Sequence, residues 1–172
     1  MNTKSIPLVV ILFFALVLEA YAQQEKGDKV FRFNGSYAKY GSADGFAFLN
    51  LKAGYFITKN IEAGVEPTIM LGSGFSQLSM GVYSTYNFIT PDAKMVPYAG
   101  LRLSAALQSL KYPDINGVTS RHTNGSGNVG IYGGLRYYVT ERVNVDSGIS
   151  YDVGSINVFM WSIGIGVILG RR

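Results

Sequence analysis

The stretch Gly54-Tyr55-Phe56-Ile57-Thr58-Lys59-Asn60-Ile61-Glu62-Ala63-Gly64 decides the fold. It has the form of a strand end, a three-residue turn and the start of a second strand. The same order of residue types returns in Arg136-Tyr137-Tyr138-Val139-Thr140-Glu141-Arg142-Val143-Asn144-Val145-Asp146 and, in part, in Tyr86-Asn87-Phe88-Ile89-Thr90. This recurrence predicts a series of hairpins that all reverse at one end of the same sheet.

Eight candidate strands surround these turns. They are Val30–Tyr40, Phe46–Ile57, Ile61–Leu71, Gln77–Ile89, Val96–Leu110, Gly127–Val139, Val143–Val153 and Asn157–Leu169. Each has roughly 11 to 15 residues, which is long for a soluble sheet and enough to cross a bilayer when the strand is tilted.

The connections between these strands alternate in kind. Those at one end are Thr58–Asn60, Thr90–Met95 and Thr140–Arg142. Those at the other end are Gly41–Gly45, Gly72–Ser76, Lys111–Ser126 and Gly154–Ser155. Counted from an inward-facing N-terminus, the first set predicts inner turns and the second predicts outer loops, one of them long.

Apolar and polar residues alternate within the strands. In the last strand Trp161, Ile163 and Ile165 share one face, while Ser162 and Gly164 share the other. Period-two alternation of this kind is typical of strands and not of helices. The sequence therefore predicts an all-β fold, an eight-stranded antiparallel up-and-down β-barrel.

The glycines indicate which face lines the lumen. A soluble, lipocalin-like lipid carrier would turn its apolar face inward, whereas a membrane barrel turns it outward. Gly54, Gly64, Gly100 and other glycines share the polar face, where small residues make room for large Tyr and Arg side chains in a narrow lumen. We therefore predict a transmembrane barrel with a polar lumen.

Aromatic residues on the apolar face predict two girdles at the membrane surfaces. Near the inner turns they are Tyr55, Tyr86, Phe88 and Tyr137, and nearer the outer loops they are Tyr151 and Trp161.

Charged residues on the polar face predict a network in the lumen. They are four cations and four anions: Arg32, Lys52, Arg102, Arg136, Glu62, Glu66, Asp146 and Asp152. The turn at Thr58–Asn60 sets Lys52 opposite Glu66, and the turn at Thr140–Arg142 sets Arg136 opposite Asp146. Opposed side chains are close enough for ion pairs, so we expect both pairs to form. Balanced signs favour a packed plug over a selectivity-lining pore or a proton-linked gate.

The first residues predict export. Met1 to Ala22 contains Lys4, an apolar run from Ile6 to Leu18 and the small residues Ala20 and Ala22, which is typical of a signal peptide. Its removal leaves residues 23–172 as one barrel domain. There is no cysteine, so disulfides and a lipid anchor on an N-terminal Cys are excluded.

The long predicted loop contains the candidate recognition residues Tyr112, Asp114, Arg121 and His122. An alternative makes His122 a general base for Ser120, oriented by Asp114, in a lipid-modifying enzyme. A polar loop tip without chemistry explains these residues more simply. One histidine does not build a metal site, and we expect no metal and no cofactor.

The chain resembles the small outer-membrane β-barrel family with OmpA-like and OmpX-like eight-stranded architecture. Members often carry a Gly-Tyr-Phe-Val/Ile-Thr-x-Asn turn motif, which Gly54–Gly64 matches closely and Tyr137–Val143 matches in part. The resemblance implies a porin-like barrel in the outer membrane of a diderm bacterium, a monomer in contact with outer-membrane lipids. It also implies insertion by the barrel-assembly machinery, although this chain ends Leu169-Gly170-Arg171-Arg172 where the family commonly has a terminal aromatic residue.

The predicted function is therefore that of an integral outer-membrane protein with a packed charged lumen and a structural or surface-recognition role, without catalysis. The alternatives are a small-solute channel, a lipid-modifying enzyme and, last, a soluble lipid carrier. The net charge of +4 comes with no basic cluster interleaved with aromatic residues, so a nucleic-acid partner is not expected.

Overall fold

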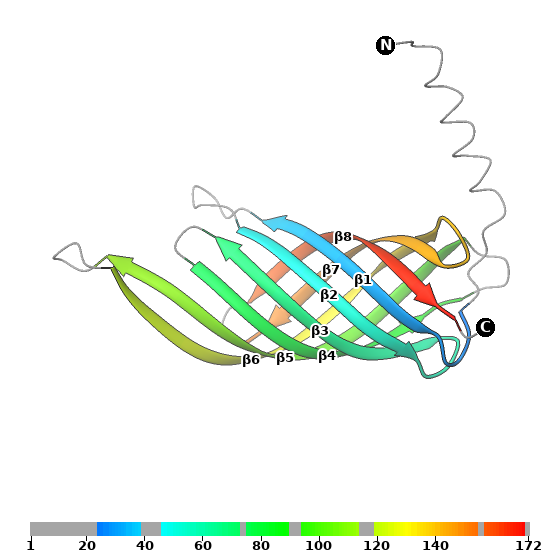
Figure 1. Ribbon diagram of the computed structural model, residues 1–172, viewed down its shortest axis with the longest axis horizontal. Coiled ribbons are helices and arrows are strands. Elements are labelled where there is room, and N and C mark those ends of the chain that lie inside the picture. The colour runs from blue at the N-terminus through cyan, green and yellow to red at the C-terminus, as the bar shows by residue number, and fades with distance from the viewer. Residues whose placement is uncertain are drawn as a thin grey trace, which may run out of the picture.

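The structure, a computed structural model, describes residues 24–38, 46–72, 75–89, 94–113, 119–154 and 157–170. Its eight strands close into an antiparallel barrel in sequence order (Figure 1). They are β1 (Lys29–Ala38), β2 (Phe46–Phe56), β3 (Ile61–Gly72), β4 (Phe75–Asn87), β5 (Met95–Pro113), β6 (Thr119–Tyr138), β7 (Val143–Val153) and β8 (Val158–Leu169). This confirms the predicted up-and-down barrel. No helix in the described residues is long and apolar enough to span a bilayer.

The repeated threonine closes two of the inner turns. Thr58 Oγ1 accepts hydrogen bonds from the backbone N–H groups of Asn60 at 3.2 Å and Ile61 at 3.0 Å. Thr140 Oγ1 accepts the equivalent bonds from Arg142 at 3.2 Å and Val143 at 2.9 Å. A hydroxyl in this position stabilises a tight turn, which explains why the same motif ends both strand pairs.

The outer wall of the barrel is apolar and the inner wall is polar. Leu103, Ile131 and Ile165 on the outer wall are each at least 57% exposed, whereas Arg32 and Glu62 on the inner wall are at most 1% exposed. An exposed apolar surface of this extent belongs in lipid rather than water. The soluble, lipocalin-like alternative, which needs the opposite arrangement, is therefore wrong.

The residues predicted to form the aromatic girdles lie on the outer wall. Tyr86 and Phe88 are exposed and pack edge to face, with ring centroids 4.9 Å apart, close to the inner end of β4. Five members of the set are between 41% and 58% exposed: Tyr55, Tyr86, Phe88, Tyr151 and Trp161. Tyr137 is half-buried.

The predicted long loop Lys111–Ser126 is wrong over most of its length. β5 and β6 remain paired as far as Pro113 and Thr119, and they project beyond the other strands at the end opposite the start of β1 and the end of β8 (Figure 1). Every residue of 119–126 is polar or glycine, so no apolar alternation marked it as strand. Above the membrane both faces of a hairpin meet water, and the backbone ladder continues without that signal.

The predicted signal peptide, residues 1–22, lies outside the described residues, so its role stays a prediction.

An arginine in the middle of the outer wall is expected to destabilise the barrel, whereas one on the projecting hairpin is not. Leu103→Arg places a charge in hydrocarbon and should lower the free energy of unfolding by about 2–4 kcal/mol. Thr123→Arg, on the exposed part of β6, should change it by less than about 0.5 kcal/mol. Urea unfolding in phospholipid vesicles, followed by the fluorescence of Trp161, measures both values. Equal effects of the two variants would contradict a lipid-facing wall.

Candidate functional site

The eight charged residues of the lumen form two clusters, each with two cations and two anions. The inner cluster lies nearer the short turns and consists of Arg32, Glu62, Arg136 and Asp146. The outer cluster lies nearer the projecting hairpin and consists of Lys52, Glu66, Arg102 and Asp152. Each cluster is electrically neutral as a unit, which offsets the cost of burying its charges.

Glu62 is the centre of the inner cluster. Its Oε1 forms an ion pair with Nη1 of Arg32, and its Oε2 lies 3.2 Å from Nη1 of Arg136. The hydroxyl of Tyr83 donates to Oε1 at 2.6 Å. Arg32 also approaches Asp146, with 3.8 Å between Nε and Oδ2. Because Glu62 is fully buried, these charge-assisted bonds replace the water it would otherwise bind.

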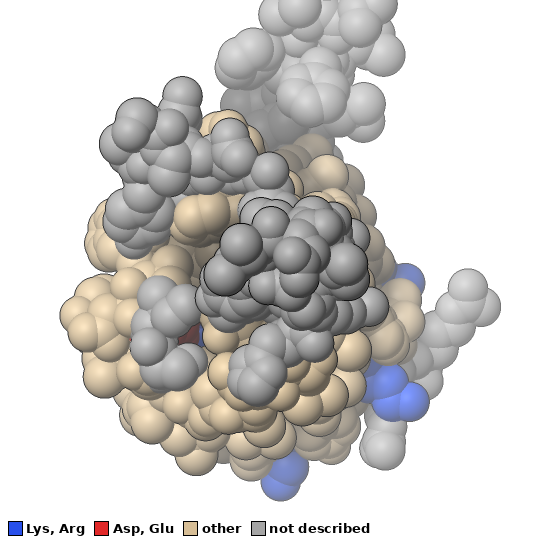
Figure 2. Space-filling model, turned by 90° about the vertical axis from the view of Figure 1, so that its left-hand side faces the viewer, with Lys and Arg blue, Asp and Glu red and all other residues tan. Residues whose placement is uncertain are grey.

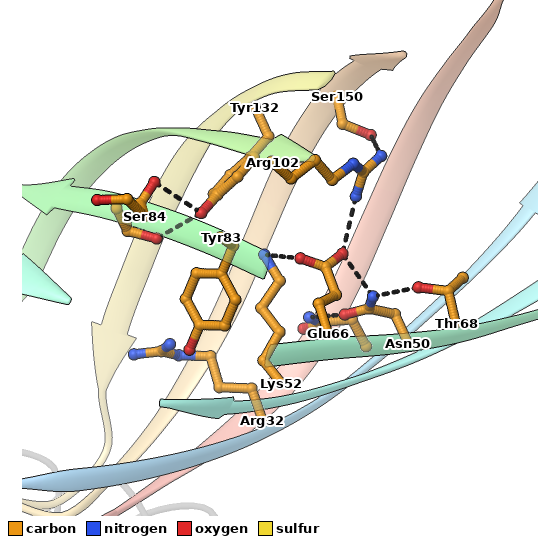
Figure 3. A network of polar contacts seen from close by, with 12 residues as sticks. Arg32, Asn50, Lys52, Glu66, Thr68, Tyr83, Ser84, Arg102, Tyr132 and Ser150 are labelled. Atoms are coloured by element: carbon orange, nitrogen blue, oxygen red, sulfur yellow. Dashed lines mark hydrogen bonds and ion pairs between the residues drawn. The ribbon is translucent and has the colours of Figure 1, made fainter. Parts of the chain in front are cut away.

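Glu66 plays the same part in the outer cluster (Figure 3). Its Oε2 lies 3.4 Å from Nζ of Lys52, and its Oε1 accepts from Nη1 of Arg102 at 2.9 Å and from Nδ2 of Asn50 at 2.6 Å. Arg102 reaches further, donating from Nε to Oδ1 of Asp152 at 2.7 Å. The cluster thus joins β2, β3, β5 and β7 across the lumen.

A layer of three tyrosines, Tyr83, Tyr98 and Tyr132, separates and supports the two clusters. Nζ of Lys52 lies 4.0 Å from the ring centroid of Tyr132, and the guanidinium carbon of Arg136 lies 4.4 Å from that of Tyr98. Cations gain electrostatic stabilisation over aromatic faces, most of all where water is excluded.

Glycines on the inner wall make room for these rings. A Cβ at Gly54 would overlap the hydroxyl of Tyr83, and one at Gly100 would overlap the ring of Tyr132. This is the crowding that the glycines on the polar face predict. The roles of the three tyrosines were missed, because period-two alternation gives the face of a residue and not its neighbours across the lumen.

An apolar plug fills the lumen at its inner end. Its side chains are at most 2% exposed and come from five strands: Val30, Phe56, Val96, Tyr138 and Ile168. The plug was also missed, since its members follow the polar alternation of the inner wall. Below it, the segment before β1 is tied to β2, because Gly27 donates its N–H to the carbonyl of Phe56 at 2.9 Å.

A cavity of about 100 Å³ lies in the lumen, lined in part by residues of both charged clusters, and extends toward the hairpin end. Amide and hydroxyl side chains line much of it, among them Asn34, Gln77, Ser79 and Asn128. Figure 2 looks onto this end, where the described residues around the opening are mostly uncharged, charged atoms show inside the opening, and Lys or Arg atoms show at the edge of the view. The volume has room for a few water molecules.

The predicted ion pairs are half right. Both hairpins have the predicted register. Gly54 of β2 is opposite Gly64 of β3, and Arg136 of β6 is opposite Asp146 of β7. Lys52 pairs with Glu66, which confirms the first ion pair. The second is wrong, because Arg136 pairs with Glu62 on β3. Its long side chain points across the lumen, and Asp146 is approached by Arg32 instead.

The four candidate recognition residues lie on the projecting hairpin, except Asp114, which is outside the described residues. In the strand register Tyr112 is opposite Ser120, Lys111 is opposite Arg121, and Leu110 is opposite His122. Among the described residues there is no group of three His, Cys, Asp or Glu side chains arranged to hold a metal ion.

Comparison with known proteins gives one family and several solved barrels. The family model described as Opacity family porin protein matches residues 26–170. The N-terminal β-barrel domain of Pseudomonas aeruginosa OprF is 20% identical with a TM-score of 0.60, over 86% of this chain and 100% of that one. Neisserial surface protein A is 25% identical with a TM-score of 0.59, over 81% and 94% of the two chains. Ail, the attachment invasion locus protein of Yersinia pestis, is 14% identical with a TM-score of 0.56, over 84% and 99%. No curated protein sequence matches the chain.

Removal of the charge on Glu62 is expected to destabilise the barrel strongly. Glu62→Gln leaves Arg32 and Arg136 buried without their shared carboxylate, which should lower the free energy of unfolding by about 3–5 kcal/mol. Glu141→Gln, in an exposed turn, is the matched control and should change it by less than about 0.5 kcal/mol. Urea unfolding in vesicles measures both. A Glu62→Gln barrel as stable as the control would mean that the inner cluster contributes nothing to the fold.

Proposed function

Because the chain belongs to the opacity family of porin proteins, we propose that it is a non-catalytic surface-recognition barrel of the bacterial outer membrane. The projecting hairpin of β5 and β6 carries its binding surface. The observation that supports this most is the length of β6 compared with its neighbour: β7 ends at Val153, opposite Val129, whereas β6 begins ten residues earlier, at Thr119.

The longer free backbone edge of the hairpin, among the described residues, belongs to β6. From Val129 back toward its first residue, Thr119, β6 has a described strand partner only on its β5 side. The N–H of Tyr138 points toward β5, because it donates to the carbonyl of Lys94 at 2.8 Å. Since β6 keeps one register with β5 throughout, its even-numbered N–H groups face β5 and its odd-numbered groups, including those of Thr123 and Gly125, face the free edge.

A free edge of this length is suited to binding an extended peptide. Such a segment adds to the sheet as a further strand, and its main-chain hydrogen bonds supply the affinity. At Gly125 nothing lies within 4 Å of a built Cβ, so the face of the hairpin is also open there. The partner class is therefore a protein with an accessible extended segment.

The lumen supports a role without catalysis or transport. Its carboxylates and guanidinium groups are engaged in ion pairs with one another, and the apolar plug fills the inner end. Groups held in this way are not available as general acids or bases for an outside substrate.

Export by cleavage after Ala22 is part of the same proposal, and the N-terminal sequence of the mature protein tests it.

Proline at the free edge is expected to abolish peptide binding without harming the barrel. Thr123→Pro with Gly125→Pro removes two N–H groups that face the edge and leaves the β5 ladder intact. The probe is a phage-displayed library of random linear peptides, selected on the detergent-solubilised chain. Peptides bound by the native chain should lose at least about tenfold in affinity for the proline variant.

The alanine variant Thr123→Ala with Gly125→Ala keeps both N–H groups and is the matched control, which should bind as the native chain does. Peptides that bind the native and proline variants equally, or a library that yields no binder, would overturn the proposal.

The native chain is expected not to conduct in planar bilayers. The plug and the two charged clusters leave no continuous aqueous path, so the current should equal that of protein-free bilayers. A general porin inserted under the same conditions shows that the measurement detects pores. Stable conductance steps from the native chain would instead favour the small-solute channel.

A further inference from the structure

Several exposed charged side chains gather at the inner end of the barrel. Among the residues whose side-chain burial the structure describes, all those that are charged and exposed lie at the inner end, in the segment before β1, in β1 itself or in the inner turns. They are Glu25, Lys26, Lys29, Lys59, Glu141 and Arg142. Cations outnumber anions by four to two in this set.

Two of these cations lie on either side of the inner end of β8. Lys29 is opposite Leu169 in the pairing of β1 with β8. On the other side of β8, the N–H of Ile168 donates to the carbonyl of Arg142 at 2.7 Å. The two residues are therefore about two strand spacings, or about 10 Å, apart. Two long, flexible side chains at this separation can converge on one anion between them.

The aromatic girdle gives the depth of this pair in the membrane. Lys29 is opposite Tyr55 in the pairing of β1 with β2, and Tyr55 is one of the exposed aromatic residues near the inner turns. Aromatic girdles lie at the level of the lipid headgroups. Lys29 therefore lies at the layer that holds the phosphate groups, and Arg142 is exposed at the same end of the barrel, two strands away.

We propose that Lys29 and Arg142 form a binding site for an anionic phospholipid in the inner leaflet of the membrane. Neither cation is joined to a carboxylate by an ion pair among the described residues, in contrast to the cations of the lumen. The site recognises the phosphate of a headgroup with net negative charge, as in phosphatidylglycerol. A zwitterionic headgroup carries its own cation, which opposes the two side chains.

The test measures the preference of the barrel for one lipid over another. The full chain is reconstituted in phosphatidylcholine vesicles, and electron paramagnetic resonance gives the association of spin-labelled phosphatidylglycerol relative to spin-labelled phosphatidylcholine. The native chain should prefer phosphatidylglycerol. Lys29→Gln with Arg142→Gln should lower this preference by about fivefold or more, since a cation near the surface typically contributes about a fivefold factor.

Two further variants separate a site from a general charge effect. Lys111→Gln with Arg121→Gln removes the same charge from the projecting hairpin and should keep the preference. Lys29→Arg with Arg142→Lys keeps both charges at the inner end and should also keep it. An equal loss in the hairpin variant, or no loss when Lys29 and Arg142 are neutralised, would overturn the proposal.

The native chain alone provides a last measurement that does not depend on the folding of any variant. The site lies at the membrane surface, so added salt screens it, and the preference for phosphatidylglycerol should fall steadily between low salt and about 1 M salt. A preference that is insensitive to salt would contradict an electrostatic site at the inner end.

Discussion

The pairing of every charge inside a narrow lumen is the constraint on which the rest of the structure depends. An eight-stranded barrel has room only for packed side chains, so each large residue must have a partner and a space. Glu62 and Glu66 each hold two cations, and each cluster reaches strands that are not neighbours in the sheet. The clusters therefore act as cross-links through the barrel, in addition to the backbone hydrogen bonds that run around it.

Much of this arrangement is predictable from sequence because it is local. A turn fixes which residues of two strands are opposite, and alternation fixes which face they share, so the Lys52–Glu66 pair follows from the hairpin alone. The ion-pair partner of Arg136 cannot be predicted from its hairpin. The guanidinium of Arg136 reaches Glu62 on β3, a strand that is brought near only when the barrel closes. The sequence of a single hairpin gives no information about contacts across the lumen. The tyrosine layer and the apolar plug were missed for the same reason.

The length of β5 and β6 was missed for a different reason. Alternation marks a strand only where its two faces meet different surroundings, as the outer wall and the lumen do within the membrane. Beyond Gly127 toward the tip of the hairpin, the β6 residues from Thr119 to Ser126 are uniformly polar or glycine, so their two faces look alike. The alternation of apolar and polar residues therefore indicates where the membrane-spanning part of a strand ends. It does not predict how far the strand pairing continues beyond that point.

The two ends of the barrel consequently present opposite chemistry. At the inner end the backbone is closed, an apolar plug fills the lumen, and the exposed groups are mostly cations beside an aromatic girdle. At the outer end the described side chains around the opening are largely uncharged, and beyond Val129 β6 has a described strand partner only on its β5 side. A free edge normally invites unwanted pairing. Here it belongs to a hairpin held by a closed barrel, so its hydrogen-bonding groups stay aligned without a partner.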